Sequence, residues 1–312
     1  MKKLCSDIAY RLLYGVTYLV SLLPYRVLYI LSDLSFLLVY YVVRYRRKVV
    51  ARNLATAFPG QYEGNRRTEK RFYHWLCDYF FETMKLLSVK PETLLRHIEY
   101  RNLDQVEEAF DRGKSCAAMA GHYCNWEYLT SMSLPMKRWK GKFSFGLIYH
   151  PLSNKAFDRL FIDIREHNHG TCVPKKDILR KLVELKKEQR LSYFGYILDQ
   201  SPKWENIHLW LPFLNHDTPV FTGAERIIRK MQNAVFYMRM ERPCRGKYIC
   251  TFELMTDQPL SLAENELTRR YFEMLEADIR RAPEFYLWTH DRWKRTHEEF
   301  NRLIAEGKLK AR

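Results

Sequence analysis

The sequence is short of acidic residues and contains no closely spaced cysteine pair. It carries 36 Asp and Glu against 52 Lys and Arg, which gives a formal net charge of +16. Its seven cysteines are scattered without a C-x-x-C spacing, so neither a disulfide framework nor a zinc site is predicted. We interpret most of these thiols as small buried hydrophobic groups in a reducing, cytoplasmic environment. The excess of positive charge predicts anionic partners, such as nucleic acid, lipid headgroups or an acidic protein.

Compositional extremes are also absent. Hydrophobic residues make up 47% and charged residues 28% of the 312 residues, which excludes disordered, collagen-like and disulfide-scaffold proteins. Aromatic residues are plentiful at 15%, and such rings favour surfaces that are apolar on one side and wet on the other. Because no nucleic-acid-binding motif occurs, this composition favours a membrane interface and predicts no nucleic-acid partner.

No charge-free run near the N-terminus reaches the roughly 20 residues that a bilayer-spanning helix needs. Two apolar runs, 12–25 and 27–43, flank Pro24, and Asp33 interrupts the second. The first 60 residues hold nine basic and two acidic side chains. We therefore predict a membrane-associated helical hairpin over residues 1–60, lying in one leaflet, with its basic flank on the cytoplasmic side. A true span, a cleaved signal peptide and an ordinary buried hairpin are the alternatives, and the signal peptide lacks a small-x-small cleavage site.

The remainder of the chain alternates short β-like runs with amphipathic helical stretches. This alternation predicts an α/β domain over residues 61–312, with a mixed central sheet flanked by helices. Residues 65–115 are expected to be helical. Strands are predicted over 116–120, 143–149, 191–198, 208–214, 235–240 and 248–254, and helices over 153–166, 175–187, 223–232 and 263–281.

The segment around His122 carries the clearest chemical signal. A β-like run ends at Gly121, His122 follows in a turn, and Glu127 comes five residues later in what is expected to be a helix. Within one helix a spacing of five separates two side chains by about 140°, so His122 and Glu127 can meet only if His122 precedes the helix. Glu127 would then accept a hydrogen bond from one imidazole nitrogen while the other acts as a general base. A solvated histidine near an exposed glutamate is the alternative.

The whole string resembles the signature of the lipid A biosynthesis acyltransferases, the lauroyl/myristoyl acyltransferase family of the lysophospholipid acyltransferase-like superfamily. Gly121, His122, Tyr123, Asn125, Trp126 and Glu127 carry the resemblance, and further motifs follow the family's order over most of the chain. These motifs are 46–49, 53–54, 58–59, 148–151, Asn154, Arg165, Asp199-Gln200, 212–214, 218–223 and 282–294. Residues 61–312 would be the acyltransferase catalytic domain.

The resemblance implies transfer of a fatty acyl chain from the thioester of an acyl carrier protein, or of coenzyme A, to a hydroxyl of a lipid A precursor. No cofactor and no metal are expected. The resemblance also implies that the protein is located at the cytoplasmic face of the bacterial inner membrane. An acyl carrier protein, anionic membrane lipid and the lipid A precursor would be the partners. His122 would remove the proton of the hydroxyl, and Glu127 would orient the imidazole.

Donors for the negative oxygen of the tetrahedral intermediate remain open. His150 stands where the family usually has Arg, so His150, Arg165 or a backbone N–H near His122 is the candidate. Asn125, Asp199 and Gln200 are further polar candidates for lining the cleft. Cys124 replaces a glycine that is common in the family and has no role in this mechanism.

Several basic side chains have two interpretations each. Arg292 and Lys294 could bind phosphate groups or form an interfacial aromatic-basic face. The pairs at 175–176 and 186–187 could dock an acidic carrier or form solvated faces.

Two other functions are compatible with the sequence. The acceptor could be another membrane lipid, with a glycero-, amino- or glycolipid headgroup, and the chain could instead be a noncatalytic basic membrane-binding protein. The glycerolipid enzymes usually contain an F-P-E-G-T-R string, which is missing here, so the lipid A precursor is favoured.

Overall fold

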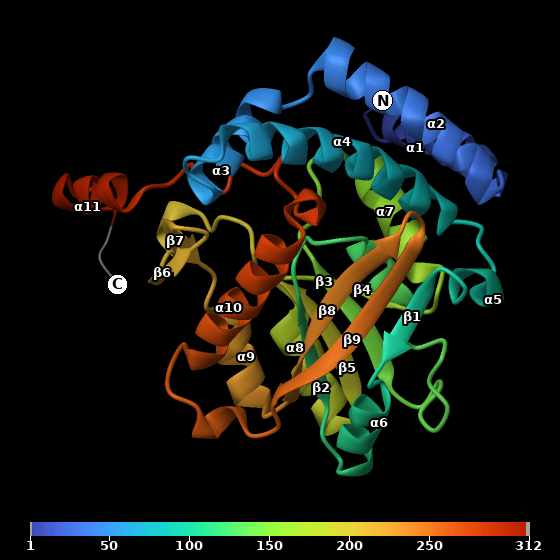
Figure 1. Cartoon of the computed structure of the whole chain (residues 1–312). Helices are drawn as coiled ribbons and strands as arrows, with labels where there is room; N and C mark the ends of the chain where they lie inside the picture. Colours follow the sequence, from blue (N-terminus) through green and yellow to red (C-terminus); the bar gives the residue numbers. More distant parts are fainter. Residues whose placement is uncertain (1, 310–312) are drawn as a thin grey trace.

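A mixed sheet lies at the centre of the molecule, with helices packed around it (Figure 1). The computed structural model describes residues 2–309, and side chains from residue 7 onward. Within these residues the main sheet has seven strands in the order β1-β9-β8-β2-β5-β3-β4, and β6 and β7 form a separate antiparallel pair. Strands β8, β2, β5, β3 and β4 run parallel, β9 is antiparallel to β8, and β1 is parallel to β9. The predicted mixed α/β architecture is confirmed.

The strands have the following bounds: β1 Ile98–Arg101, β2 Cys116–Ala120, β3 Ser144–Tyr149, β4 Thr171–Pro174, β5 Ser192–Ile197, β6 Leu209–Phe213, β7 His216–Val220, β8 Ala234–Cys244 and β9 Lys247–Thr256. The α-helices are α1 Lys2–Leu22, α2 Tyr25–Leu37, α3 Arg47–Ala57, α4 Tyr62–Lys85, α5 Pro91–Leu94, α6 Asp104–Asp111, α7 Lys155–Glu166, α8 Ile178–Lys187, α9 Gly223–Met231, α10 Glu266–Arg281 and α11 His297–Ala305. Shorter or irregular helical segments are η1 Leu38–Val43, η2 Trp126–Ser131, η3 Trp204–Asn206, η4 Pro259–Ser261 and η5 Pro283–Phe285.

Each predicted strand and helix of the α/β region overlaps an observed one, but the predicted strand set was incomplete. The strand at 208–214 is β6, which pairs with β7 outside the main sheet. Strands β1, β4 and β7 were not predicted, and β1 interrupts a region expected to be wholly helical. These strands have only four or five residues, and β1 and β4 lie at the two edges of the sheet, so their sequences lack the hydrophobic runs of the central strands.

Small residues let helix α10 pack closely over the end of β2. All five residues of β2 are buried, and the hydroxyl of Tyr271 on α10 donates a hydrogen bond of 2.8 Å to the carbonyl of Ala120. A Cβ atom at Gly121 would lie only 2.5 Å from a methyl carbon of Leu275. A side chain at this point would force Leu275 to move, so glycine allows the close approach of α10 where the chain leaves the sheet before His122.

Helices α1 and α2 lie on the outer side of α4 (Figure 1), and each packs against it. The inner face of α2 and η1 is buried at four-residue intervals, at Leu28, Ser32, Phe36 and Tyr40. Pro24 caps α2 and separates it from α1, as its position in the sequence predicted. In the described part of the chain, Tyr25–Val43 is the segment that is long and apolar enough to cross a membrane.

The outer faces of these helices carry large apolar side chains that no other element covers. On α1 they recur at helical spacing, so they form one stripe along the helix. The exposed residues are Ile8, Leu12, Val16, Leu19 and Leu22 on α1, and Ile30, Leu34, Leu37, Leu38, Tyr41, Val42 and Val43 on α2 and η1. We call these twelve side chains the outer apolar face.

Buried charges hold α2 to α4 and to the β8–β9 hairpin. The Asp78 carboxylate of α4 is fully buried and accepts a hydrogen bond of 2.7 Å from the Ser32 hydroxyl of α2. It also pairs with Arg242 of β8 and with Arg245 of the β8–β9 turn, each at 2.6 Å. Arg245 makes a further ion pair with Asp33 of α2 at 2.7 Å. One carboxylate therefore joins α2, α4 and the β8–β9 hairpin.

Replacing Asp78 by Ala should lower the free energy of unfolding by about 3 kcal/mol, because it leaves the buried Arg242 guanidinium without its ion-pair partner. Glu266→Gln serves as the control variant. It breaks an exposed ion pair with Arg270 and should change the free energy of unfolding by less than about 0.5 kcal/mol. Thermal or denaturant unfolding of the full chain in detergent measures both. Equal effects of the two substitutions would contradict this account of Asp78.

Candidate active site

The pairing register of two parallel strands brings His122 and Asp199 together. Ala120 of β2 and Ile197 of β5 are register partners. His122 comes two residues after Ala120, and Asp199 comes two residues after Ile197. Parallel neighbours advance equally along the sheet, so the two side chains meet beyond its carboxyl edge. Nδ1 of His122 lies 2.8 Å from Oδ1 of Asp199, and the same oxygen accepts a bond of 3.2 Å from the backbone N–H of His122.

The surroundings of the imidazole favour one neutral tautomer. When Nδ1 carries the proton it donates to Asp199, which leaves a lone pair on Nε2. The amide nitrogen of Gln200 lies 3.3 Å from Nε2 and can donate to that lone pair. The His122 side chain is 19% exposed, whereas that of Asp199 is 2% exposed. The partly exposed imidazole therefore stands at the carboxyl edge of the sheet, where open α/β sheets usually bind ligands.

Asp199 stays ionised although it is buried. Burial alone would raise the pKa of its carboxyl group, but the charge of His122 and the hydrogen bonds from His122 outweigh burial and hold the pKa below its usual value. An ionised carboxylate at this point favours the protonated imidazole that forms when Nε2 accepts a proton. The pair therefore has the geometry and charge of a general base with an orienting carboxylate.

Glu127 occupies a different place from the one expected. Its carboxylate makes a two-point ion pair with Arg165 of α7, at 2.8 and 2.6 Å, and accepts the Trp126 indole N–H at 3.1 Å. The expected hydrogen bond from the imidazole of His122 to Glu127 is wrong for this structure, because Asp199 takes that position. Glu127 contacts Trp126, whose ring packs edge-on against the imidazole of His122 with the centroids 5.0 Å apart.

The Glu127–Arg165 pair is held in its charged form. Burial opposes ionisation of Glu127, but the charge and hydrogen bonds of Arg165 lower its pKa below the usual value. Arg165 likewise has a raised pKa, because Glu127 outweighs the effect of burial. The pair engages Nε and Nη2 of Arg165, so Nη1 is the guanidinium nitrogen left over as a donor to a substrate oxygen.

The other predicted site residues lie at two different places. Asn125 is fully buried and its amide donates a bond of 2.8 Å to Glu82 of α4, so it anchors the loop that follows His122. His150 is exposed at the end of β3, and burial, with the nearby charges of Lys175 and Lys203, lowers its pKa. Of the predicted polar residues, Asp199 and Gln200 both contact the imidazole.

The loop after His122 is strained at Cys124. This residue has a φ of 52°, in the left-handed region that glycine adopts without cost. The glycine common at this place in the resembling family has a physical explanation here. Cys124 is fully buried and its thiol pKa is raised well above the usual value by burial, which makes it a poor nucleophile.

The C-terminal motif closes over the same loop. Leu287 donates a backbone bond of 3.0 Å to the carbonyl of His122, and Cys124 donates one of 2.9 Å to the carbonyl of Phe285. Nε2 of His290 accepts a bond of 3.0 Å from the N–H of Ser201, next to Gln200. Burial lowers the pKa of His290 to about 4, so this ring is neutral near pH 7. Sequence reasoning did not assign these positioning contacts, although the motif itself was the available signal.

Arg292 of that motif is a buried residue and does not bind phosphate at the surface. It is 1% exposed, and one guanidinium nitrogen donates a bond of 2.8 Å to the carbonyl of Pro219. Its Nε and Nη1 have no partner among the described residues. The phosphate-binding interpretation of Arg292 is therefore wrong, whereas Lys294 is exposed.

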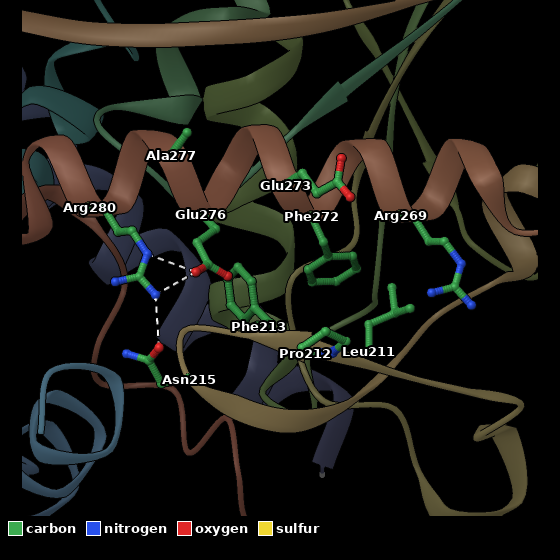
Figure 2. A pocket seen from close by; sticks show the side chains of 10 residues that line it. All are labelled: Leu211, Pro212, Phe213, Asn215, Arg269, Phe272, Glu273, Glu276, Ala277 and Arg280. Atoms are coloured by element: carbon green, nitrogen blue, oxygen red, sulfur yellow. Dashed lines mark hydrogen bonds and ion pairs between the residues drawn. The ribbon is translucent and has the colours of Figure 1, made fainter.

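A separate pocket of about 500 Å³ lies between the β6–β7 pair and α10. Figure 2 shows that Leu211, Pro212, Phe213 and Phe272 form its apolar part. At one end Arg280 bonds to Glu276 and to the Asn215 side-chain oxygen, so those charges are already paired. The pocket contains no histidine, and Tyr271 and Leu275 of α10 contact β2 from the same helix. It is therefore distinct from the His122 site.

Comparison with known protein families identifies the family of the chain. Residues 4–295 match the family model described as bacterial lipid A biosynthesis acyltransferase. The chain belongs to this family. It is therefore an acyltransferase, as the resemblance of its motifs implied. A comparison with curated protein sequences gave no significant match.

Replacing Glu127 by Gln in this acyltransferase should destabilise the fold by about 3 kcal/mol at neutral pH, because Arg165 loses a buried partner. The folded-state pKa of Glu127 is lowered, so the stabilisation is present above the usual pKa of a glutamate and is lost as the pH falls through the lower, folded value. The difference in unfolding free energy between wild type and Glu127→Gln should therefore shrink on acidification. Glu184→Gln, in an exposed pair with Lys181, serves as the control with little effect at any pH.

Replacing Cys124 by Gly should leave the acyl transfer rate close to that of the wild type. The left-handed backbone at this position suits glycine, and the buried thiol takes no part in the proposed chemistry. Steady-state kinetics with the purified variant measure this. Complete loss of transfer in a folded Cys124→Gly protein would assign a catalytic role to the thiol.

Proposed function

We propose that this acyltransferase moves a fatty acyl chain from the thioester of an acyl carrier protein to a hydroxyl of a lipid A precursor. The observation that carries the proposal is the His122–Asp199 pair, in which a buried carboxylate holds a partly exposed imidazole at the carboxyl edge of the sheet, in a chain of this family. The net charge of +16 suits both proposed substrates, since the carrier protein is acidic and the acceptor carries phosphates.

His122 removes the proton of the acceptor hydroxyl through Nε2. The hydroxyl oxygen attacks the thioester carbonyl carbon and forms a tetrahedral intermediate with a negatively charged oxygen. When this intermediate collapses the carbon–sulfur bond breaks, and the imidazolium returns the proton to the leaving thiolate. Asp199 stabilises the imidazolium while it holds the proton, so His122 acts in turn as base and acid. The chain's own side chains supply these steps, and no bound cofactor is part of the proposal.

Arg165 is the proposed donor to the negatively charged oxygen. Its Nε and Nη2 are fixed by Glu127, which leaves Nη1 on a guanidinium whose position is set in advance. In this proposal the orienting role expected of Glu127 passes to Asp199. Asp199 orients the base, and Glu127 positions Arg165 together with Trp126.

Replacing His122 by Ala should lower kcat by at least about 10²-fold, because the proton acceptor is removed. The assay combines purified chain, acyl carrier protein thioester and lipid A precursor, with mass spectrometry of the lipid product. In cells, loss of one acyl chain from lipid A should be restored by the wild-type gene and not by His122→Ala. An unchanged lipid A profile without the gene would contradict the proposed acceptor.

We propose that the outer apolar face inserts into the cytoplasmic leaflet of the inner membrane. The family is typically membrane associated. The opposite side of α2 is buried against α4 and tied to it through Asp78, which favours a helix lying along the membrane over one crossing it. The basic side chains that follow Val43 would lie at the level of the lipid headgroups.

A triple variant, Leu12→Glu, Val16→Glu and Leu19→Glu, should lose most of its binding to vesicles that contain anionic lipid, because charges replace inserted apolar groups. Vesicle co-sedimentation gives the bound fraction. Leu254→Glu with Leu260→Glu changes exposed apolar residues elsewhere and should bind as the wild type does. Equal loss in both variants would point to a general effect of charge and against a defined membrane face.

A further inference from the structure

Three cations gather beside the catalytic loop from two distant parts of the chain. They are Arg46, before α3, and Lys294 and Arg295, at the end of the C-terminal motif, and we call them the rim cluster. Arg46 donates to the carbonyl of Thr289, the adjacent His290 accepts from the N–H of Ser201, and Arg295 contacts the hydroxyl of the same serine. Partial burial, together with the charges of Arg295 and Arg46, lowers the pKa of Lys294 against the opposing effect of Asp291. Among the described residues no carboxylate oxygen lies within 4 Å of a side-chain nitrogen of the cluster, and Asp291 is paired with Arg52 at 2.6 Å.

Contacts with neutral groups hold two of these cations in place. Arg46 has a φ of 53° and donates a bond of 2.9 Å to the carbonyl of Thr289. Arg295 donates to the Ser201 hydroxyl at 3.4 Å, its guanidinium lies 5.4 Å from the centre of the Trp204 ring, and its buried Nε has no partner in the described chain. Neighbouring like charges repel, and an anion bound among them would reduce that repulsion.

The cluster lies between the catalytic base and the outer apolar face. Ser201, the partner of Arg295, directly follows Gln200, whose amide lies 3.3 Å from Nε2 of His122. Arg46 comes three residues after Val43, the last residue of the outer apolar face. A lipid held in the leaflet beside this face would therefore present its headgroup to the rim cluster and a nearby hydroxyl to His122.

We propose that the rim cluster binds a phosphate group on the acceptor lipid and so positions its hydroxyl at His122. This inference rests on the proposed function, since it names how the acceptor is recognised. A phosphate monoester carries up to two negative charges and several acceptor oxygens, which suits two guanidinium groups and one ammonium group. The position beside the outer apolar face favours a lipid phosphate over an acidic protein, which would approach from the aqueous side.

The test compares a phosphorylated acceptor lipid with the same lipid after its phosphate has been removed, in detergent micelles with the full chain. The double variant Lys294→Gln with Arg295→Gln should raise KM for the phosphorylated acceptor about tenfold or more, because two charged donors are lost. Its KM for the dephosphorylated acceptor and for the acyl donor should stay at the wild-type value. Arg46 is left unchanged because it also holds Thr289.

The control variant, Lys140→Gln with Lys142→Gln, removes two exposed lysines from the loop that precedes β3. This loop lies at the amino end of β3, whereas His122 lies at the carboxyl edge of the sheet. The control variant carries the same change in net charge and should leave every KM unchanged. Thermal unfolding checks that both double variants fold. If the rim variant is destabilised, the single variant Lys294→Gln, at an exposed side chain, provides the same comparison with a smaller rise in KM.

Several outcomes overturn the inference while leaving the proposed function intact. An equal rise in KM for both acceptor forms would show that the cluster does not recognise phosphate, and a rise in KM for the donor would assign it to carrier docking. Inhibition of the wild type by inorganic phosphate to the same degree with both acceptors would indicate a free-anion site. Absence of transfer by the wild type with either acceptor would instead contradict the proposed function.

Discussion

The parallel hydrogen bonding of β2 to β5 is the constraint on which the active site depends. It sets Ala120 beside Ile197, and two residues later it sets His122 beside Asp199. A shift of one residue in this register would turn alternate side chains to the other face and separate the pair. Close packing protects the register, since Leu275 of α10 fills the space over Gly121 and Tyr271 bonds to Ala120.

Three buried carboxylates of this enzyme are paired with groups from other elements, and these pairs join the parts of the fold. Asp78 links α2 to the β8–β9 hairpin, Glu127 links η2 to α7, and Asp199 links β5 to the loop after β2. A buried carboxylate without its partner would destabilise the folded state, so each pair fixes the relative position of two elements. The rigid arrangement around His122 is a consequence of this pairing.

In the functions proposed above, the outer apolar face contacts lipid and His122 carries out the chemistry, and a series of contacts connects the two. The chain leaves the outer apolar face at Val43, passes Arg46, and is then held to the C-terminal motif by Asn53, which donates to the carbonyls of Trp288 and His290. His290 in turn accepts from Ser201 beside the catalytic loop. This series of hydrogen bonds gives the N-terminal helices a fixed position relative to His122, as an enzyme with a membrane-embedded acceptor requires.

The sequence by itself determined the family, the mixed α/β class and the elements with strong hydrophobic patterns. The strand at 116–120 was predicted with its observed ends, because a run of small apolar residues stops at Gly121. The turn position of His122 followed from the same pattern. Such patterns reflect interactions within a few residues, and this is why the short edge strands β1 and β4 escaped prediction.

Only the tertiary structure decided which carboxylate contacts the base. Glu127 is five residues from His122, whereas Asp199 is 77 residues away and becomes its neighbour through the order of strands in the sheet. Arg165 arrives from α7 to bind Glu127, and Arg292 is removed from solvent by the packing of the C-terminal motif. Strand order and burial depend on contacts between distant segments, and local sequence patterns do not encode those contacts.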